Sequence, residues 1–311
     1  MTTQPLTIVG AGLAGLLAAA AWPNATLVER SAAPTQAHRA LLRFRSEAVA
    51  QLTGIEFRRV QVRKGIWDGA GFIAPTIRAA NQYSQKCIDR LGAERSIWNV
   101  APVERFIAPD DLHEQLLDSV RGRVVYGVDA FAPNAPFAGP FVSTAPLSAT
   151  SAALDITPPG MEFGRAPIFV QRVDLGPRCD VFQTIYFPDP DLSLYRASIT
   201  GRTLIMEFAS EREPFDKAAC TLEVIHAFGL SGGTDWVPMG GVKQQYGKIA
   251  PIEDDAARKA LLFRLTHQFG IYSLGRFATW RNILLDDVVQ DIAVVKRLMR
   301  AGVYDLRAAA A

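Results

Sequence analysis

Apolar residues follow two different periods along the chain, and these periods predict its elements. Near the N-terminus, the apolar run Thr7–Val9 leads into a glycine turn and an alanine-rich segment, and a second apolar run ends at Glu29. This order predicts a strand, a turn, a helix and a second strand. Alternating apolar positions, interrupted by Pro and Gly, predict strands of an antiparallel sheet at residues 168–173, 181–187, 192–199 and 203–208.

Helical spacing of apolar residues appears in later segments. The predicted helices cover residues 77–91, 215–228 and 254–269. Another helix is predicted from Asp286 onward, after a short strand at Ile271–Ser273. Further strands are predicted at residues 122–128, from Phe141, and at residues 244–250. A chain of 311 residues with these elements is expected to hold one or two domains.

Three glycines with the spacing Gly-x-Gly-x-x-Gly lie between the first predicted strand and helix. Gly10 permits the tight turn, Gly12 lets the backbone approach a pyrophosphate, and Gly15 allows the helix to pack on the strands. Glu29 is placed to accept hydrogen bonds from ribose hydroxyls. This context favours a dinucleotide site over an ordinary glycine-rich turn, but it does not separate NAD from FAD. The predicted cofactor-binding residues in this part are Gly10, Gly12, Leu13, Ala14, Gly15, Glu29 and Arg30.

Composition narrows the class of protein. Hydrophobic residues make up 49% of the chain and charged residues 21%, which excludes a disordered or collagen-like chain. No apolar run reaches the roughly 18 residues that cross a bilayer, and no secretory signal is recognisable, so we expect a cytoplasmic protein that does not enter a membrane. Neither the cysteines Cys87, Cys179 and Cys220 nor the histidines have metal-ligand spacing, so the cysteines are expected to be reduced and no metal is predicted.

Residues 39–64 carry the sharpest charge asymmetry of the chain. The only acids in this segment are Glu47 and Glu56. Its cations are Arg39, Arg43, Arg45, Arg58, Arg59, Arg63 and Lys64. The plain interpretation is a solvated face. The alternative is a surface past which a phosphate-bearing substrate approaches, including a base carried in nucleic acid. The predicted partner is therefore a small molecule or a phosphate-bearing substrate.

Three later segments follow one another in the order of a flavin-binding chain. Residues 271–289 contain Gly275, Arg276, Ala278, Trp280, Leu285 and Asp286. The segment Phe141–Leu147 and the strand that ends near Val128 precede it. Together with the glycine motif, these segments resemble the superfamily of UDP-galactopyranose mutase and the flavin amine oxidases, over roughly residues 5–40, 100–150 and 265–300. Taken alone, residues 271–289 can also be a strand, a glycine turn and an Asp-rich helix start that need no ligand.

The resemblance implies that the cofactor is FAD. The predicted fold class is α/β: an FAD-binding Rossmann-like parallel sheet domain with an inserted antiparallel-sheet substrate domain plus helices. Residues 1–60, 100–150 and 265–311 are expected to form the FAD-binding domain, and residues 61–99 and 151–264 the substrate or cap domain. The resemblance further implies that FAD is bound by Val128, Thr144, Gly275, Arg276, Trp280, Leu285 and Asp286.

The resemblance also suggests catalytic residues, each with a simpler alternative. Arg196 lies in a strand similar to one that binds the substrate anion in mutases, and the alternative is a solvated arginine at a strand edge. His38 is similar to a histidine placed beside the flavin, and the alternative is an exposed helix start. Lys248, with Tyr246, is a candidate to hold a water at flavin N5, and the alternative is an exposed hairpin. The chain departs from the mutases at Leu284, where they carry an aspartate near the sugar, and a second mutase arginine has no counterpart.

These features lead to one main hypothesis and two alternatives. The main hypothesis is an FAD-dependent oxidoreductase that oxidises an amine by hydride transfer to flavin N5, with a phosphate-bearing substrate as an extension. The first alternative is a flavin-dependent non-redox mutase or lyase acting on a nucleotide-sugar or a modified nucleotide or DNA base. The second alternative is a flavin-binding regulatory module without turnover.

Overall fold

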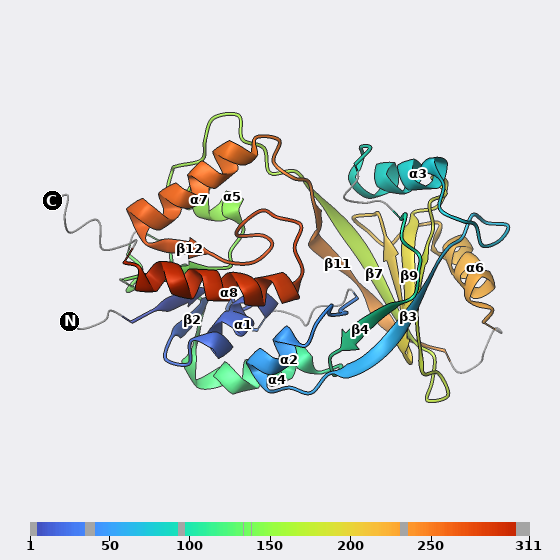
Figure 1. Cartoon of the computed structure of the whole chain (residues 1–311), viewed down its shortest axis with the longest axis horizontal. Coiled ribbons are helices and arrows are strands. Elements are labelled where there is room, and N and C mark those ends of the chain that lie inside the picture. Colours follow the sequence, from blue (N-terminus) through green and yellow to red (C-terminus); the bar gives the residue numbers. More distant parts are fainter. Residues whose placement is uncertain are drawn as a thin grey trace.

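The computed structural model describes residues 5–34, 41–92, 97–132, 134–137, 139–230 and 236–302. Its strands form two sheets that lie side by side (Figure 1). The long strands β7 (Arg165–Asp174) and β11 (Val237–Ile249) run from one half of the molecule into the other (Figure 1). The first sheet draws its strands from residues 7–29, 124–143 and 271–273, and the second from residues 58–107 and 165–249.

The first sheet is parallel throughout. Its order is β12-β6-β1-β2-β5, and every neighbouring pair runs in the same direction. The strands are β1 (Thr7–Val9), β2 (Thr26–Glu29), β5 (Val124–Tyr126), β6 (Phe141–Ser143) and β12 (Ile271–Ser273). A short 3-10 turn, η2 (Arg121–Arg123), leads into β5. The prediction that separated segments assemble a parallel sheet is therefore confirmed.

Helices cover both faces of this parallel sheet. They are α1 (Leu13–Ala21), α2 (Ala48–Thr53), α4 (Leu112–Val120), α5 (Leu147–Ala153), α7 (Asp255–Phe269) and α8 (Leu285–Arg300). On one face, Leu16, Leu116 and Ile292 from α1, α4 and α8 share a core with Ile8 and Leu27 of the sheet. On the other face, α5 and α7 share a core with β12. The carboxyl ends of β1 and β2 thus meet at an edge of the sheet, where doubly wound folds bind their ligands.

The second sheet has the order β11-β7-β10-β9-β8-β3-β4. Besides β7 and β11, its strands are β3 (Arg58–Ile66), β4 (Val103–Ile107), β8 (Val181–Tyr186), β9 (Leu194–Gly201) and β10 (Thr203–Phe208). Neighbouring strands are antiparallel except β3 and β8, so the sheet is mixed rather than purely antiparallel. Helix α6 (Lys217–Phe228) packs on one face and α3 (Ile77–Ile88) packs against residues of the other.

Strands β3 and β4 were not predicted. In β3, Val60 and Val62 are buried and alternate with exposed Arg59, Gln61 and Arg63, which is the period of a half-buried strand. The dense charge of this stretch masks its alternation in the sequence. Strand β4 falls in the range 100–150 that was expected to belong to the FAD-binding domain, yet it pairs with β3 in the second sheet. The predicted domain boundaries as such stay a prediction.

Candidate functional site

The glycine turn has one tightly packed side and one open side. Gly10 has a positive φ of 96°, and a Cβ at this position would lie 2.7 Å from the Thr144 hydroxyl oxygen. A Cβ at Gly15 would lie 1.7 Å from the Gly10 carbonyl oxygen, so α1 packs directly on the turn. At Gly12, by contrast, an added Cβ would meet no atom within 4 Å. The turn therefore faces open space only where a ligand is expected to approach.

The N-terminus of α1 lies at this opening. Gly12 is the N-cap residue, and no side chain caps the helix there. Leu13 and Ala14 form the start of the first turn and are half-buried. The first N–H groups of a helix have no partner within the helix, and together with the helix dipole they favour an anion. The geometry fits the pyrophosphate of a dinucleotide.

Glu29 stands at the end of β2, next to the turn. Its Oε2 accepts a hydrogen bond from the Ala11 N–H at 2.8 Å, and its Oε1 accepts one from the Ser31 N–H at 2.9 Å. Each carboxylate oxygen keeps a second lone pair, so Glu29 can still accept a ribose hydroxyl. The Val128 N–H donates to the Glu29 carbonyl oxygen at 3.2 Å. This contact brings Val128, another predicted FAD-binding residue, next to Glu29. Arg30 is exposed beside them.

Two residues predicted to bind the cofactor, Thr144 and Gly275, contact the glycine turn and α1. The Thr144 hydroxyl donates to the Val9 carbonyl oxygen at 2.8 Å and to that of Gly10 at 3.2 Å. Gly275 has a positive φ of 91°, and a Cβ there would lie 2.9 Å from the Ala14 Cβ. The segment after β12 therefore contacts the first turn of α1, and the structure unites motifs that the sequence only placed in order.

Trp280 lies in the protein core. Its side chain is among the largest that are fully buried, with 2% of the residue exposed, and its φ is positive at 49°. The indole N–H donates to the Ala250 carbonyl oxygen at 3.0 Å, and the ring packs edge-on against Phe163 with a centroid distance of 5.0 Å. Trp280 thus packs in the core as part of residues 274–284, between β12 and α8, which we call the returning segment. Its predicted contact with the cofactor stays a prediction.

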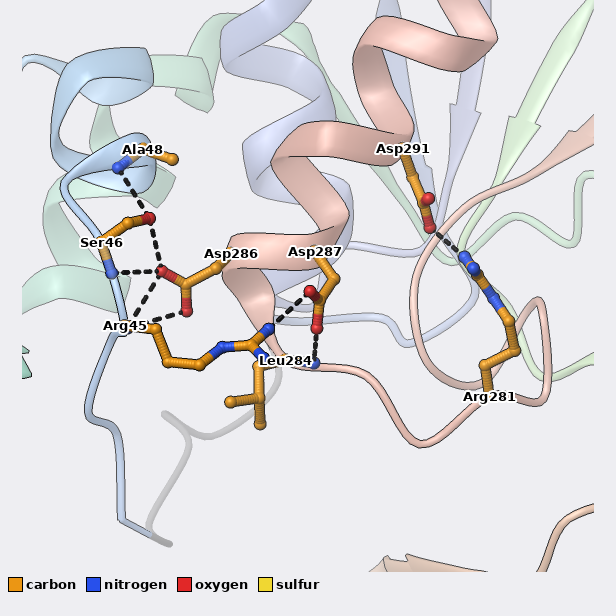
Figure 2. A network of polar contacts seen from close by, with 8 residues as sticks. All are labelled: Arg45, Ser46, Ala48, Arg281, Leu284, Asp286, Asp287 and Asp291. Atoms are coloured by element: carbon orange, nitrogen blue, oxygen red, sulfur yellow. Dashed lines mark hydrogen bonds and ion pairs between the residues drawn. The ribbon is translucent and has the colours of Figure 1, made fainter.

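Asp286, in the first turn of α8, holds the chain that leads into α2 (Figure 2). Its Oδ1 accepts hydrogen bonds from the Arg45 N–H at 3.1 Å, from the Ser46 N–H at 2.9 Å and from the Ser46 hydroxyl at 2.9 Å. Its neighbour Asp287 accepts from the Leu284 N–H at 2.8 Å and pairs with the Arg45 guanidinium at 2.5 Å. The Asp286 carboxylate is buried in this network. It therefore joins two segments, and the half-buried Leu285 packs on the core beside it.

A cavity of about 610 Å³ lies between the returning segment and one face of the second sheet; we call it the main cavity. The returning segment contributes Arg276, Phe277, Asn282 and Leu284. The second sheet and its neighbours contribute polar and aromatic side chains, among them Arg43, Lys64, Tyr83, Arg105, Tyr186, Tyr195, Arg196, Glu207, Lys243 and Tyr246. The structure therefore brings together three residues singled out from the sequence, Arg196, Tyr246 and Arg276.

Arg196 is not the solvated arginine of the alternative interpretation. It lies on β9, an interior strand, and its guanidinium donates two hydrogen bonds to Glu207, one of them to Oε1 at 2.8 Å. Glu207 is 1% exposed. Burial lowers the pKa of Arg196, but the ion pair with Glu207 outweighs this effect and raises the pKa well above its ordinary value. The pair is therefore a fixed, charged part of the cavity wall.

Lys248 is not in the main cavity. Its ammonium lies 3.9 Å from the centroid of the Tyr195 ring, and it is buried. Lys248 lines a separate cavity of about 380 Å³ together with Lys86, while Tyr195 lines the main cavity. The predicted partner Tyr246 does line the main cavity, where its ring packs on Phe277 at 5.2 Å. His38, the remaining catalytic candidate, and Arg39 lie outside the described residues.

The basic segment does not form the single approach surface considered from the sequence. Arg58 pairs with Asp180 and Arg59 with Glu104, and both arginines line a third cavity of about 900 Å³. Arg45 pairs with Asp287, and Arg63 is exposed. Of the cations of this segment that the structure describes, only Arg43 and Lys64 line the main cavity. Side chains of β3 alternate between its two faces, and acids distant in the sequence pair with some of them. Charges that are adjacent in the sequence are therefore separated in the structure.

Sequence reasoning missed Glu207, Arg105 and Tyr186 in the cavity wall. Each is an ordinary residue of an alternating strand, and only the order of strands in the second sheet brings them together. A signal was present for Glu207, since a lone acid in the apolar run Thr203–Phe208 requires a buried partner. Among the residues that the structure describes, no group of His, Cys, Asp and Glu is arranged to hold a metal ion, and no helix is long and apolar enough to span a bilayer.

Known structures share this architecture. No protein-family model matches the sequence, and no curated protein matches it. Reduced UDP-galactopyranose mutase is similar over 96% of this chain and 95% of its own, with 15% identity and a TM-score of 0.58. p-Nitrophenol 4-monooxygenase from Pseudomonas putida DLL-E4 is similar over 97% of this chain and 80% of its own, with 11% identity and a TM-score of 0.53.

A protein from Photorhabdus luminescens subsp. laumondii TTO1, described as an FAD containing monooxygenase, is similar over 96% of this chain and 90% of its own, with 11% identity and a TM-score of 0.50. At these identities the likeness concerns the fold. The chain is thus an α/β protein with the FAD-binding Rossmann-like fold of UDP-galactopyranose mutase and these monooxygenases, as the sequence resemblance predicted.

Proposed function

We propose that the chain binds FAD and functions as a flavin-dependent oxidoreductase. The observation that carries this proposal is the open space at Gly12, in front of a helix end that no side chain caps. A pyrophosphate fits there because its oxygens can accept hydrogen bonds from the free N–H groups. Glu29 and Val128, which lie side by side at the end of β2, would hold the adenosine half. The fold shared with the mutase and an FAD containing monooxygenase supports FAD over NAD.

The returning segment leads from this nucleotide end to the main cavity. Gly275 contacts Ala14 of α1, and the next residues, Arg276 and Phe277, line the main cavity. When bound, FAD supplies a ring that accepts a hydride from a substrate carbon. Arg276 would place a positive charge beside that ring and favour its reduced, anionic form. The main cavity would orient the substrate and exclude water around it.

Oxidation of an amine is a finer proposal. The charge of the main cavity restricts the charge that such an amine can carry. Cationic side chains outnumber acidic ones among the described lining residues, and the acid, Glu207, is already paired with Arg196. An ammonium group is repelled by such a wall. An amine oxidised here would therefore enter in its neutral form, or as part of a molecule that also carries negative charge.

A second candidate function is the non-redox mutase or lyase. The same excess of cations favours it, because a nucleotide-sugar or nucleotide substrate carries phosphate. The two candidates differ in their need for electrons. An oxidoreductase transfers electrons from substrate to flavin at each turnover, whereas a non-redox mutase needs the flavin reduced beforehand and consumes no oxidant.

The first experiment is to purify the protein and record its flavin content and absorbance spectrum. A yellow protein that releases FAD on denaturation supports the proposal, and a colourless protein that cannot be reconstituted with FAD contradicts it. Anaerobic addition of substrate pools then distinguishes the candidates: bleaching of the flavin supports the oxidoreductase. Turnover only after reduction with dithionite supports the mutase, and neither result supports the regulatory module.

Gly12→Val tests the position of the cofactor with little disturbance of the protein. The N-cap backbone at Gly12 has φ −71° and ψ 176°, which any residue adopts, and nothing in the protein contacts an added Cβ. We expect the variant to fold normally and to lose most of its FAD. Gly122→Val is the matched control, since its Cβ also enters open space, but far from the turn in sequence. Full flavin occupancy in Gly12→Val contradicts the assignment of this turn.

A further inference from the structure

The wall of the main cavity is strongly unbalanced in charge. Its cationic side chains are Arg43, Lys64, Arg105, Arg196, Lys243 and Arg276. Among the described residues that line it, Glu207 is the only acid. Glu207 is already bound to Arg196, and Lys243 faces Glu211 at 3.8 Å. Besides Arg276, the remaining cations of the wall are Arg43, Lys64 and Arg105.

Arg43, Lys64 and Arg105 form no ion pair within the part of the chain that the structure describes. They donate only to neutral acceptors. Arg43 donates to the Thr184 hydroxyl at 2.8 Å and to two backbone carbonyl oxygens of the second sheet, at 3.0 Å and 2.7 Å. Arg105 donates to its neighbour's carbonyl oxygen at 2.7 Å, and Lys64 to that of Asn99 at 3.4 Å. Their positions are fixed while their charges are not neutralised.

Arg105 repels both Arg43 and Lys64. The pKa of Arg43 is lowered to about 9, mainly by burial and next by the neighbouring cation Arg196, with a smaller contribution from Arg105; Tyr186 and Glu207 oppose this shift. Burial and Arg105 likewise lower the pKa of Lys64. Like charges held together out of water raise the free energy of the protein unless a counter-charge joins them. A bound anion would supply that counter-charge.

Other cations on the same strand do not share this property. Arg58, also on β3, makes two hydrogen bonds of 2.8 Å with the Asp180 carboxylate, and Arg59 pairs with Glu104. The fold thus pairs Arg58 and Arg59 with acids outside the main cavity, whereas no acid in the described part of the chain pairs with Lys64 inside it. This contrast within one strand separates a site from a generally basic surface.

We propose that the substrate of the main cavity carries an anionic oxygen group, a carboxylate or a phosphate, which binds at Arg43, Lys64 and Arg105. The proposal rests on the proposed function, because it names the substrate class of that same cavity. Charge-assisted hydrogen bonds to a forked guanidinium suit either group. The tyrosine side chains of the wall, Tyr83, Tyr186, Tyr195 and Tyr246, offer flat surfaces to the body of the substrate.

Calorimetric titration of the purified protein tests this with matched probes. Benzoate and benzamide have the same shape and differ in charge, phenyl phosphate carries the other anionic group, and benzylamine carries a cation. We expect either benzoate or phenyl phosphate to bind at least about tenfold more tightly than benzamide. The affinity for this anion should fall as the salt concentration rises, and benzylamine should not bind. The better anion identifies carboxylate or phosphate. Equal affinity for benzoate, phenyl phosphate and benzamide, or no anion binding, overturns the proposal.

Substitutions in the cavity wall test which residues form the anion site. Lys64→Gln and Arg105→Gln are each expected to weaken the preferred anion about tenfold and to leave benzamide unchanged. Arg58→Gln, on the same strand but outside the main cavity, is the matched control and is expected to change neither. Unchanged anion affinity in the Lys64→Gln, Arg105→Gln double variant overturns the proposal, provided that circular dichroism and the melting temperature show a folded protein.

Flavin absorbance is read in the same samples, so that failure of the two proposals can be distinguished. A yellow protein without anion preference overturns the anion site alone. A colourless protein that still prefers the anion overturns the FAD-dependent function and supports the anion site.

Discussion

The glycine turn and the main cavity are two ways of building a binding site. The turn uses backbone groups of one continuous segment. Glycine is required where the protein packs on it, since a Cβ at Gly15 would collide with the Gly10 carbonyl oxygen. The main cavity uses side chains from strands far apart in the sequence, including Lys64, Arg105 and Arg196. A backbone site of this kind is therefore sensitive to any added side-chain atom that meets the protein or the ligand. A site built from charged side chains depends on which of the charges are paired. The following predictions test each half of this contrast.

The largest effect is expected at Gly15. Gly15→Ala places a Cβ 1.7 Å from the Gly10 carbonyl oxygen, so the turn or α1 must move, and we expect a loss of about 3 kcal/mol or more in the free energy of unfolding. Gly12→Ala meets no atom of the protein and should change stability by less than about 0.5 kcal/mol. Urea unfolding of flavin-free protein measures both, because bound cofactor would add its own stabilisation. Equal losses in the two variants would break the distinction between packed and open glycines.

The next effect concerns the buried charge of the main cavity. Glu207→Gln leaves Arg196 without its counter-charge, and we expect a loss of about 3 kcal/mol in the free energy of unfolding. Asp180→Asn is the control, since the Arg58–Asp180 pair is exposed, with side-chain exposures of 60% and 56%, and should cost less than about 1 kcal/mol. Urea unfolding at neutral pH measures both. A small loss in Glu207→Gln would mean that the wall does not depend on this pair.

A smaller effect is expected where the two regions meet. Asp286→Ala removes an acceptor from the Arg45 and Ser46 N–H groups and the Ser46 hydroxyl, and we expect a loss of about 2 kcal/mol in the free energy of unfolding. Asp287→Ala removes one N–H contact and an exposed ion pair, and about 1 kcal/mol is expected. If the order of the two losses is reversed, Asp286 does not join α8 to the segment before α2.

The last prediction concerns the dependence of stability on pH. Burial lowers the pKa of Lys86 to about 8, below that of an unfolded lysine at about 10.4. Between these values the unfolded chain binds more protons than the folded chain, so stability should rise with pH, by less than about 1.4 kcal/mol per pH unit from this group. Below about pH 8 both states are protonated and this contribution is flat.

The slope in Lys86→Met tests this assignment. Urea midpoints over this pH range should rise less in Lys86→Met than in the wild type, whereas Lys259→Met, an exposed lysine paired with Asp255, should leave the slope unchanged. The slope, rather than the absolute stability, is the quantity to compare, since the Lys86 ammonium also donates to the Phe187 and Leu194 carbonyl oxygens at 2.8 Å and 3.0 Å. An unaltered slope would assign the pH dependence to another group.

Elements with a strong local signal were predicted well. The predicted helix at 254–269 appears as α7, whose N-terminus is capped by the Asp254 side chain at 2.8 Å from the Ala257 N–H. The glycine turn appears between β1 and α1, and the helix predicted from Asp286 begins at Leu285. In each case the deciding contacts lie within a few residues along the chain. A short stretch of sequence therefore contains the physical reason for the element.

The main cavity and the roles of single polar residues were decided by the tertiary structure. Trp280 lies in the core, and Asp286 accepts hydrogen bonds from Ser46. Some described cations of the basic segment form ion pairs, and others line the main cavity. The sequence by itself determined the strand, glycine turn and helix at the start of the parallel sheet, because backbone turns and apolar periods act locally. Which charge is neutralised depends on which distant acid folds against it, and only the packing of the strands brings Asp180 to Arg58 and leaves Lys64 and Arg105 facing a cavity.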